Sequence, residues 1–349
     1  MRKKKINFIV LCVCVLTICT GFSSCGKQKS KYSAYAFDYF DTVTTITGYA
    51  SNREEFDLVC DEIFRHLAEY HKLFTIYDRY DDLANLRTVN TAHETLEVDE
   101  RIIDMLLYAK EMYNLTGGKM NIAMGSVLSV WHEYREIGMT SPQLAELPPM
   151  DVLTEAAAHV DIEKLLIDEE ARTVTLADDK MSLDVGAIAK GYAVEMVAQM
   201  LEEKGILGYV LNVGGNVRTI GTKNDGEKWL VGIENPFDEG ESYIEYLSLA
   251  GESVVTSGSY QRYYFVDGKA YHHIIDGETL MPAEGYRSVS VVCRSSADGD
   301  AFSTALFCMP FEDGLALVES LEGVEVMWVF PDGEKRYSSG FSGYIAKRE

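Results

Sequence analysis

Residues 183–193 read LDVGAIAKGYA, where an acidic residue and a run of small residues join a short strand, expected at 181–185, to a helix, expected at about 187–204. The first turn of a helix presents unpaired N–H groups that suit an anion such as phosphate. Gly186 allows close backbone approach, and Lys190 places a cation where the helix dipole disfavours it unless an anion is bound. A plain strand-to-helix connection with a surface lysine explains the same sequence equally well.

Outward from this segment, helices and strands alternate without a regular βαβ repeat, which favours an α+β fold over a doubly wound sheet. Residues 132–150 contain three prolines and predict a surface excursion. Neither a G-x-G-x-x-G nor a Walker sequence is present, so a Rossmann or P-loop nucleotide site is not supported. The remaining expected helices are 52–73, 99–115, 300–309 and 311–321, and the expected strand regions are 39–49, 164–177, 208–213, 229–293 and 324–337.

The composition describes a globular body, with 47% hydrophobic and 25% charged residues in a chain of 349. Its formal net charge is −23. Phosphate binding on nucleic acid needs clustered Lys and Arg, so this balance argues against nucleic acid as a partner.

The N-terminus is basic at residues 2–5, apolar at 6–20 and small-residue-rich just before Cys25. The apolar run is shorter than the about 20 residues that span a bilayer, and the whole pattern is typical of a signal peptide. Small residues before a Cys resemble a bacterial lipobox, so we expect a signal at 1–24, acylation of Cys25, a lipidated tether at 25–36 and one domain at 37–345. The protein would then be anchored in the cell envelope, facing outside the cytoplasm. A plain signal peptide with an incidental Cys is the alternative.

Asp300 and Thr304 are four residues apart and share one face of an expected helix. A carboxylate and a hydroxyl supply hard oxygen ligands of the kind that Mg²⁺ takes, with substrate phosphates completing its shell. An N-capping Asp and a Thr bonded to its own helix backbone are the simpler explanation.

Two adjacent histidines, His272 and His273, fall late in an expected strand, so only one of them can face a given site. A hydrogen-bonded structural histidine is the alternative to a catalytic one. Earlier in the chain, residues 74–78 place an aromatic beside an acid, and residues 116–124 form a Gly-rich turn before small and apolar residues. Either segment suits the wall of a pocket for a flat ring, or is plain structure.

Taken together, these pieces resemble the ApbE family of FAD:protein FMN transferases. The resemblance runs in order from about residue 38 to residue 340. Its strongest parts are LDVGAIAKGYA (183–193), LNVGGNVRTI (211–220), VVTSGSYQR (254–262), YHHIID (271–276) and DAFSTAL (300–306).

The resemblance implies an ApbE-like fold, with mixed or antiparallel sheets and packed helices, and specific site residues. Its metal site would use the Ala187 carbonyl with Asp300 and Thr304, and His273 would be the catalytic histidine, with His272 as the fallback. The implied FAD contacts are Phe40, Tyr77, Lys119, Met120, Asn121, Asp184, Lys190 and His273. This chain departs from the family pattern at Phe40, where Met is frequent, at Met120-Asn121, where Phe-Asp is usual, and at Asp276-Gly277, where Asp-Pro is usual.

The implied activity is Mg²⁺-dependent cleavage of FAD, with FMN passing to a threonine of an exported acceptor flavoprotein and AMP leaving. Metal bridging of the diphosphate would neutralise charge and polarise the bond under attack. Two other hypotheses are an FAD diphosphatase, in which water replaces the threonine, and a flavin-binding lipoprotein without catalysis. A pure carrier needs no metal face at Asp300 and Thr304, which is the feature that separates it from the enzymes.

Overall fold

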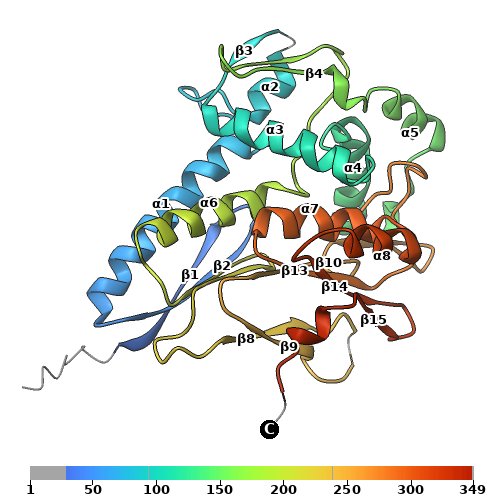
Figure 1. Cartoon of the computed structure of the whole chain (residues 1–349). Coiled ribbons are helices and arrows are strands. Elements are labelled where there is room, and N and C mark those ends of the chain that lie inside the picture. Colours follow the sequence, from blue (N-terminus) through green and yellow to red (C-terminus); the bar gives the residue numbers. More distant parts are fainter. Residues whose placement is uncertain (1–28, 93, 238, 348–349) are drawn as a thin grey trace, which may run out of the picture.

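The computed structural model describes residues 29–347 except residues 93 and 238 (Figure 1). The expected signal at 1–24 and the expected lipidation site Cys25 lie outside the described residues. Within the described part, no helix is both long and apolar enough to cross a membrane.

The centre of the molecule is an eight-stranded sheet of order β1-β2-β6-β7-β10-β13-β14-β15. Every neighbouring pair in it is antiparallel, which confirms the α+β class expected from the sequence. β1 begins at Ser30, so the folded domain includes residues that we assigned to the tether, and its start at residue 37 was placed too late. The strands are β1 Ser30–Tyr39, β2 Thr42–Ala50, β6 Tyr209–Val213, β7 Asn216–Ile220, β10 Ser253–Gly258, β13 Ser288–Cys293, β14 Glu325–Val329 and β15 Lys335–Tyr337.

Helices cover one face of this sheet, as Figure 1 shows. Apolar side chains at helical spacing on α6, including Val194, Val197 and Leu201, pack with Ile46 of β2 and Leu211 of β6. Burial of such a helix face against a sheet is what holds α/β layers together. These helices are α1 Arg53–Phe74, α6 Ala189–Glu203, α7 Ser296–Phe307 and α8 Phe311–Glu319.

The remaining elements form smaller units around this layer pair. The helices are α2 Leu86–Ala92, α3 Glu100–Leu115, α4 Gly125–Thr140 and α5 Met150–Ala157, with short 3-10 turns at Pro142–Leu144, Ile162–Lys164 and Phe341–Gly343. A three-stranded sheet joins β3 Leu96–Glu97, β5 Thr173–Leu176 and β4 Leu165–Asp168, and two hairpins pair β8 Trp229–Glu234 with β9 Tyr243–Leu249 and β11 Tyr263–Val266 with β12 Lys269–His272.

The expected surface excursion at 132–150 is wrong over its first part, because α4 continues to Thr140. The three prolines all follow the end of this helix and therefore do not interrupt it. Trp131 fixes α4 against the segment that carries Leu280. The Trp131 side chain is buried, and its Nε1–H donates to the Leu280 carbonyl at 2.9 Å.

The strand expected at 181–185 is also absent, since this segment makes only an isolated bridge between Ser182 and Met124. Its backbone is paired instead with a side chain. The amide of Asn90 donates to the Leu183 carbonyl at 2.9 Å and accepts from the Leu183 N–H at 2.8 Å. A single asparagine thereby replaces a neighbouring strand just before the segment turns into α6.

Candidate active site

A cavity of about 520 Å³ lies where the start of α6, the middle of α7, the β1–β2 turn, α4 and the segment after β12 meet. The structure brings together in its wall every FAD, metal and catalytic residue expected from the sequence. These are Phe40, Tyr77, Lys119, Met120, Asn121, Asp184, Ala187, Lys190, His273, Asp300 and Thr304. Residues far apart in the chain therefore share one polar pocket.

Asp300 is only 4% exposed and sits inside α7. The helix is capped by Ser295, which accepts from the Asp298 N–H, so the simpler interpretation of Asp300 as the N-cap is wrong. One carboxylate oxygen accepts from the Gly191 N–H at 2.8 Å and lies 3.5 Å from Lys190 Nζ. α6 and α7 are thus joined through this carboxylate at the cavity wall.

The same contact leaves an acceptor free at the start of α6. In a regular helix the Gly191 N–H would donate to the Ala187 carbonyl, four residues earlier. Here that N–H points to Asp300, and no backbone N–H of the described chain donates to the Ala187 carbonyl. The expected carbonyl ligand is therefore available beside the expected carboxylate ligand.

Two further oxygens lie in this part of the wall. Thr304 Oγ1 is 3.3 Å from the Ser257 hydroxyl. Asn216 places its amide nitrogen 3.5 Å from Asp300, while its buried Oδ1 has no hydrogen-bond partner among the described residues. Because an unpaired buried acceptor is unfavourable, this oxygen fits a cation or a donor from a ligand.

Within residues 29–347, apart from the two gaps, no cluster of three or more His, Cys, Asp or Glu could hold a metal. An ion beside Asp300 would be held by that carboxylate, by the neighbouring neutral oxygens and by oxygens of a ligand. That donor set fits Mg²⁺, which takes one or two carboxylates and completes its shell with water and phosphate.

At the start of α6, Asp184 accepts from the Gly186 N–H at 2.8 Å. Burial raises the pKa of Asp184 above its ordinary value, and this hydrogen bond opposes the rise. Lys190 donates to the Gly186 carbonyl at 3.1 Å, so its ammonium folds back over the turn towards Asp300.

The two adjacent histidines differ in their hydrogen bonding. His272 is held by the backbone, because its Nε2 lies 2.9 Å from the Ala283 carbonyl and its Nδ1 accepts from the Ile274 N–H at 3.3 Å. His273 follows the end of β12, lines the cavity, and its buried Nδ1 has no partner in the described chain. Burial, with Arg262 and Arg135 nearby, lowers the pKa of His273 to about 3.

The ring-binding candidates form the outer wall. Phe40 and Asp41 both have positive φ, 53° and 52°, and make the tight turn between β1 and β2. Tyr77 is half exposed, and its ring lies 5.5 Å from the ring of His132 on α4. These aromatic side chains come from separate elements and line the same cavity.

The side chains of the turn after α3 are held by contacts within the protein, which we did not expect from the family resemblance. Lys119 forms ion pairs with Asp276 at 3.3 Å and Glu278 at 2.8 Å. Met120 is almost fully buried, and the Asn121 amide donates to the Val160 carbonyl at 3.0 Å. Asp276, which comes just before the Gly277 that replaces the family's usual proline, thus fixes Lys119 in the wall.

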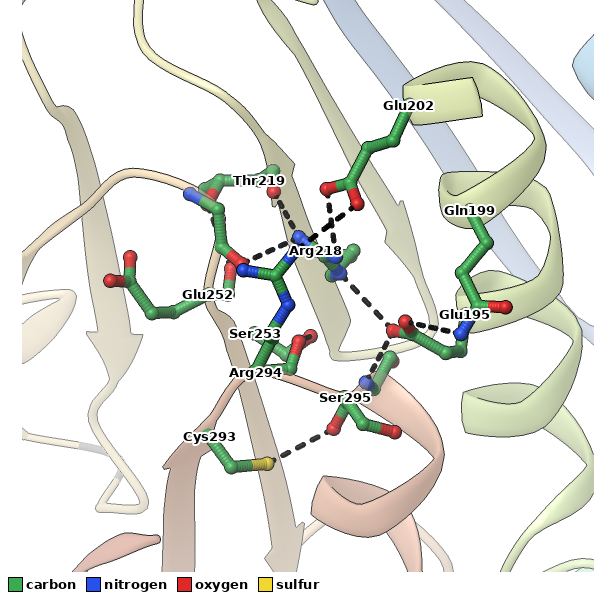
Figure 2. Close-up of polar contacts among 12 residues, drawn as sticks. Glu195, Gln199, Glu202, Arg218, Thr219, Glu252, Ser253, Cys293, Arg294 and Ser295 are labelled. Atoms are coloured by element: carbon green, nitrogen blue, oxygen red, sulfur yellow. Dashed lines mark hydrogen bonds and ion pairs between the residues drawn. The ribbon is translucent and has the colours of Figure 1, made fainter. Parts of the chain in front are cut away.

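A buried ion-pair network supports the two helices that carry the site (Figure 2). Arg218 of β7 is fully buried and lies 3.1 Å from Glu195 and 2.9 Å from Glu202, both on α6. Glu195 also accepts from the Ser296 N–H at the start of α7, at 2.9 Å. One carboxylate therefore links α6, β7 and α7 behind the cavity.

Sequence reasoning missed Arg135, Arg262 and Asn216, all of which line the cavity. Arg262 and Asn216 lie inside the motifs VVTSGSYQR and LNVGGNVRTI, so their positions were marked even though their roles were not. No sequence pattern indicated a role for Arg135, because this residue lies in the segment that we expected to be a surface excursion.

The antiparallel sheet is layered with helices, and the cavity combines the buried carboxylate of Asp300, free oxygens and several cations, a set of groups that suits a phosphate-bearing ligand. The chain belongs to the ApbE family, whose model matches residues 40–328.

Curated relatives share this assignment over most of their length. The FAD:protein FMN transferase of Treponema pallidum (strain Nichols) is 30% identical over 344 residues, which cover 94% of this chain and 92% of that protein. The FAD:protein FMN transferase of Klebsiella pneumoniae (strain 342) is 29% identical, covering 78% and 82%.

Solved structures agree with the fold. The ApbE protein of Thermotoga maritima superposes with a TM-score of 0.79 at 27% identity, covering 91% of this chain and 100% of the other. The flavin transferase ApbE of Vibrio cholerae gives a TM-score of 0.75 at 25% identity, covering 90% and 99%.

Proposed function

We infer that this protein is an FAD:protein FMN transferase. The observation that carries the inference is the cavity that gathers all eleven expected FAD, metal and catalytic residues, in a chain of the ApbE family. FAD is the substrate, and a second protein is the acceptor.

We propose that the acceptor is an exported flavoprotein and that the acceptor group is a threonine hydroxyl. Its oxygen would attack the phosphorus on the FMN side of the diphosphate. The bond from that phosphorus to the bridging oxygen breaks, AMP leaves with that oxygen, and FMN remains on the threonine as a phosphoester. A base must take the hydroxyl proton within about 2.6–3.2 Å.

His273 is the proposed base. Its imidazole is neutral at pH 7, since burial and the nearby cations lower its pKa to about 3, and its Nδ1 has no partner within the described chain. A diphosphate bound beside Arg262 and Arg135 would offset their positive charge and raise this pKa towards the range of an effective base.

Mg²⁺ is the proposed cofactor, and the Ala187 carbonyl, Asp300 and Thr304 are its proposed ligands. Support comes from the buried carboxylate, the carbonyl without a backbone donor and the neighbouring hydroxyl. When bound, the ion would neutralise charge on the diphosphate and polarise the bond under attack. Asp300 would hold this ion and keep α6 in place through Gly191.

The cellular setting is also a proposal: acylation at Cys25 anchors the protein in the cell envelope, facing outside the cytoplasm. The observation in support is the basic, apolar and small-residue pattern before Cys25. Incorporation of a labelled fatty acid that is lost in Cys25→Ala would support the anchor, and equal labelling of both proteins would refute it.

The transfer reaction is tested by incubating the protein with FAD, Mg²⁺ and a proven acceptor flavoprotein, then reading covalent flavin by in-gel fluorescence and mass spectrometry. The wild type should add the mass of FMN less one water to one threonine. Asp300→Asn should lower turnover at least about 100-fold, because one charged ligand of the ion is lost, while retaining measurable flavin binding. No labelled acceptor with the wild type would refute the transferase. Transfer that is independent of Mg²⁺ would refute the metal site.

A further inference from the structure

Four Lys and Arg side chains line the cavity, and they differ in whether they lie near a carboxylate. Lys119 is paired with Asp276 and Glu278, and Lys190 lies 3.5 Å from Asp300. The other two, Arg135 of α4 and Arg262 after β10, have no ion pair with any described carboxylate. Two positive charges in the wall are therefore left without a partner of opposite sign.

The two arginines are near enough to repel each other. Burial of the guanidinium and, to a lesser extent, the proximity of Arg262 lower the pKa of Arg135. Asp184 and Asp41 also line the cavity, but neither is within ion-pair distance of these arginines. The only hydrogen bond of Arg135 in the described chain is with the His132 ring, at 2.9 Å.

This arrangement is unusual in a protein whose net charge is −23, where carboxylates are plentiful. Arg135 is partly buried and Arg262 is exposed, and like charges held close together in a cavity wall are unfavourable unless a ligand compensates them. Guanidinium groups suit phosphate oxygens especially well, because their planar donors form paired, charge-assisted hydrogen bonds.

We propose that Arg135 and Arg262 together bind the diphosphate of FAD. The proposal deepens the transferase function and rests on it. Each of the two phosphates carries about one negative charge near pH 7, so two unpaired arginines match the charge of the ligand. Asp300, Lys190 and the start of α6 line the other part of the same cavity.

The cavity wall favours the diphosphate over an acidic segment of the acceptor as the ligand. Arg135 is only partly exposed, and its charge acts on Asp184 and His273, which line the same cavity. An acceptor chain would meet the outer rim first, whereas these interactions are with residues of the wall itself.

The test compares flavins that differ only in phosphate. Binding of FAD, FMN and riboflavin to the purified protein is measured by flavin fluorescence, with a chelator present so that the result does not depend on a metal. Arg135→Gln and Arg262→Gln should each weaken FAD at least about tenfold and leave riboflavin, which has no phosphate, within twofold. Arg172→Gln is the matched control, since its side chain is 51% exposed on β5's hairpin and pairs with Glu97 instead of lining the cavity.

Two results would overturn the proposal. Parallel weakening of FAD and riboflavin would mean that the arginines only shape the pocket. Unchanged FAD affinity would exclude them from the diphosphate, and an accompanying rise in KM for the acceptor alone would assign them to acceptor binding. Because the readout is reversible binding, failure here is distinct from failure of the transferase function, which is read as covalent flavin on an acceptor.

Discussion

Replacing Glu195 by Gln tests whether the buried network behind the cavity holds α6 and α7 in place. The change keeps the shape of the side chain and removes its charge. Glu195 lies 3.1 Å from the fully buried Arg218 and accepts from the Ser296 N–H at 2.9 Å, so both contacts lose their charge assistance.

The expected loss of unfolding free energy follows from these contacts. Removing one partner of a buried ion pair costs about 3–5 kcal/mol, because the remaining charge is left buried. Arg218 keeps Glu202 at 2.9 Å as a second partner, which places the expected loss near the lower end, about 3 kcal/mol. Since the same carboxylate binds the start of α7, the position of Asp300 in that helix should shift and turnover should fall with stability.

The assay is urea unfolding at pH 7, followed by tryptophan fluorescence, with Arg294→Gln as the control. Arg294 reaches the same network through Glu202 at 3.4 Å, but its side chain is 78% exposed, so its loss should stay below about 1 kcal/mol. A loss below about 1 kcal/mol for Glu195→Gln as well would refute the reasoning, because Arg218 would then not depend on this charge.

Three other changes address single contacts of the site. His273→Leu should make the free energy of unfolding less dependent on pH in acid. The pKa of His273 in the folded protein, about 3, lies below its ordinary value of 6.5, so its contribution to stability is present above pH 6.5 and is lost as the pH falls towards 3. In urea unfolding, the wild type should therefore lose about 1.5 kcal/mol more than the variant between pH 6.5 and pH 5. Gly191→Ala should reduce thermal stability and turnover together, because its Cβ would lie 2.3 Å from the Ser296 carbonyl oxygen and 2.5 Å from Asp300 Cβ; an unchanged melting temperature would contradict this. Asn90→Ala should lower unfolding free energy by about 1–3 kcal/mol by leaving the Leu183 backbone unpaired, and faster amide exchange at residues 183–186 would locate the effect.

Local patterns in the sequence determined α1, α3, α6, α7 and α8 and the chemistry-bearing motifs, but not α2, α4 or α5. The four-residue spacing of Asp300 and Thr304 places both on one face of α7 whatever surrounds that helix. The small residues before α6 predicted a tight turn, and the structure has one, with Asp184 bonded to the Gly186 N–H. Such features depend on neighbouring residues alone, so their periodicity is visible in the chain itself.

Only the tertiary structure decided which of these residues meet. The sequence could not show that the Gly191 N–H leaves its helical acceptor for Asp300, more than a hundred residues later, nor that Asn90 replaces a strand beside Leu183. It also hid Arg135, because the helical packing of α4 outweighed the proline-based expectation of a loop. Long-range contacts depend on how the sheet and helices are layered, and local propensity carries no record of that arrangement.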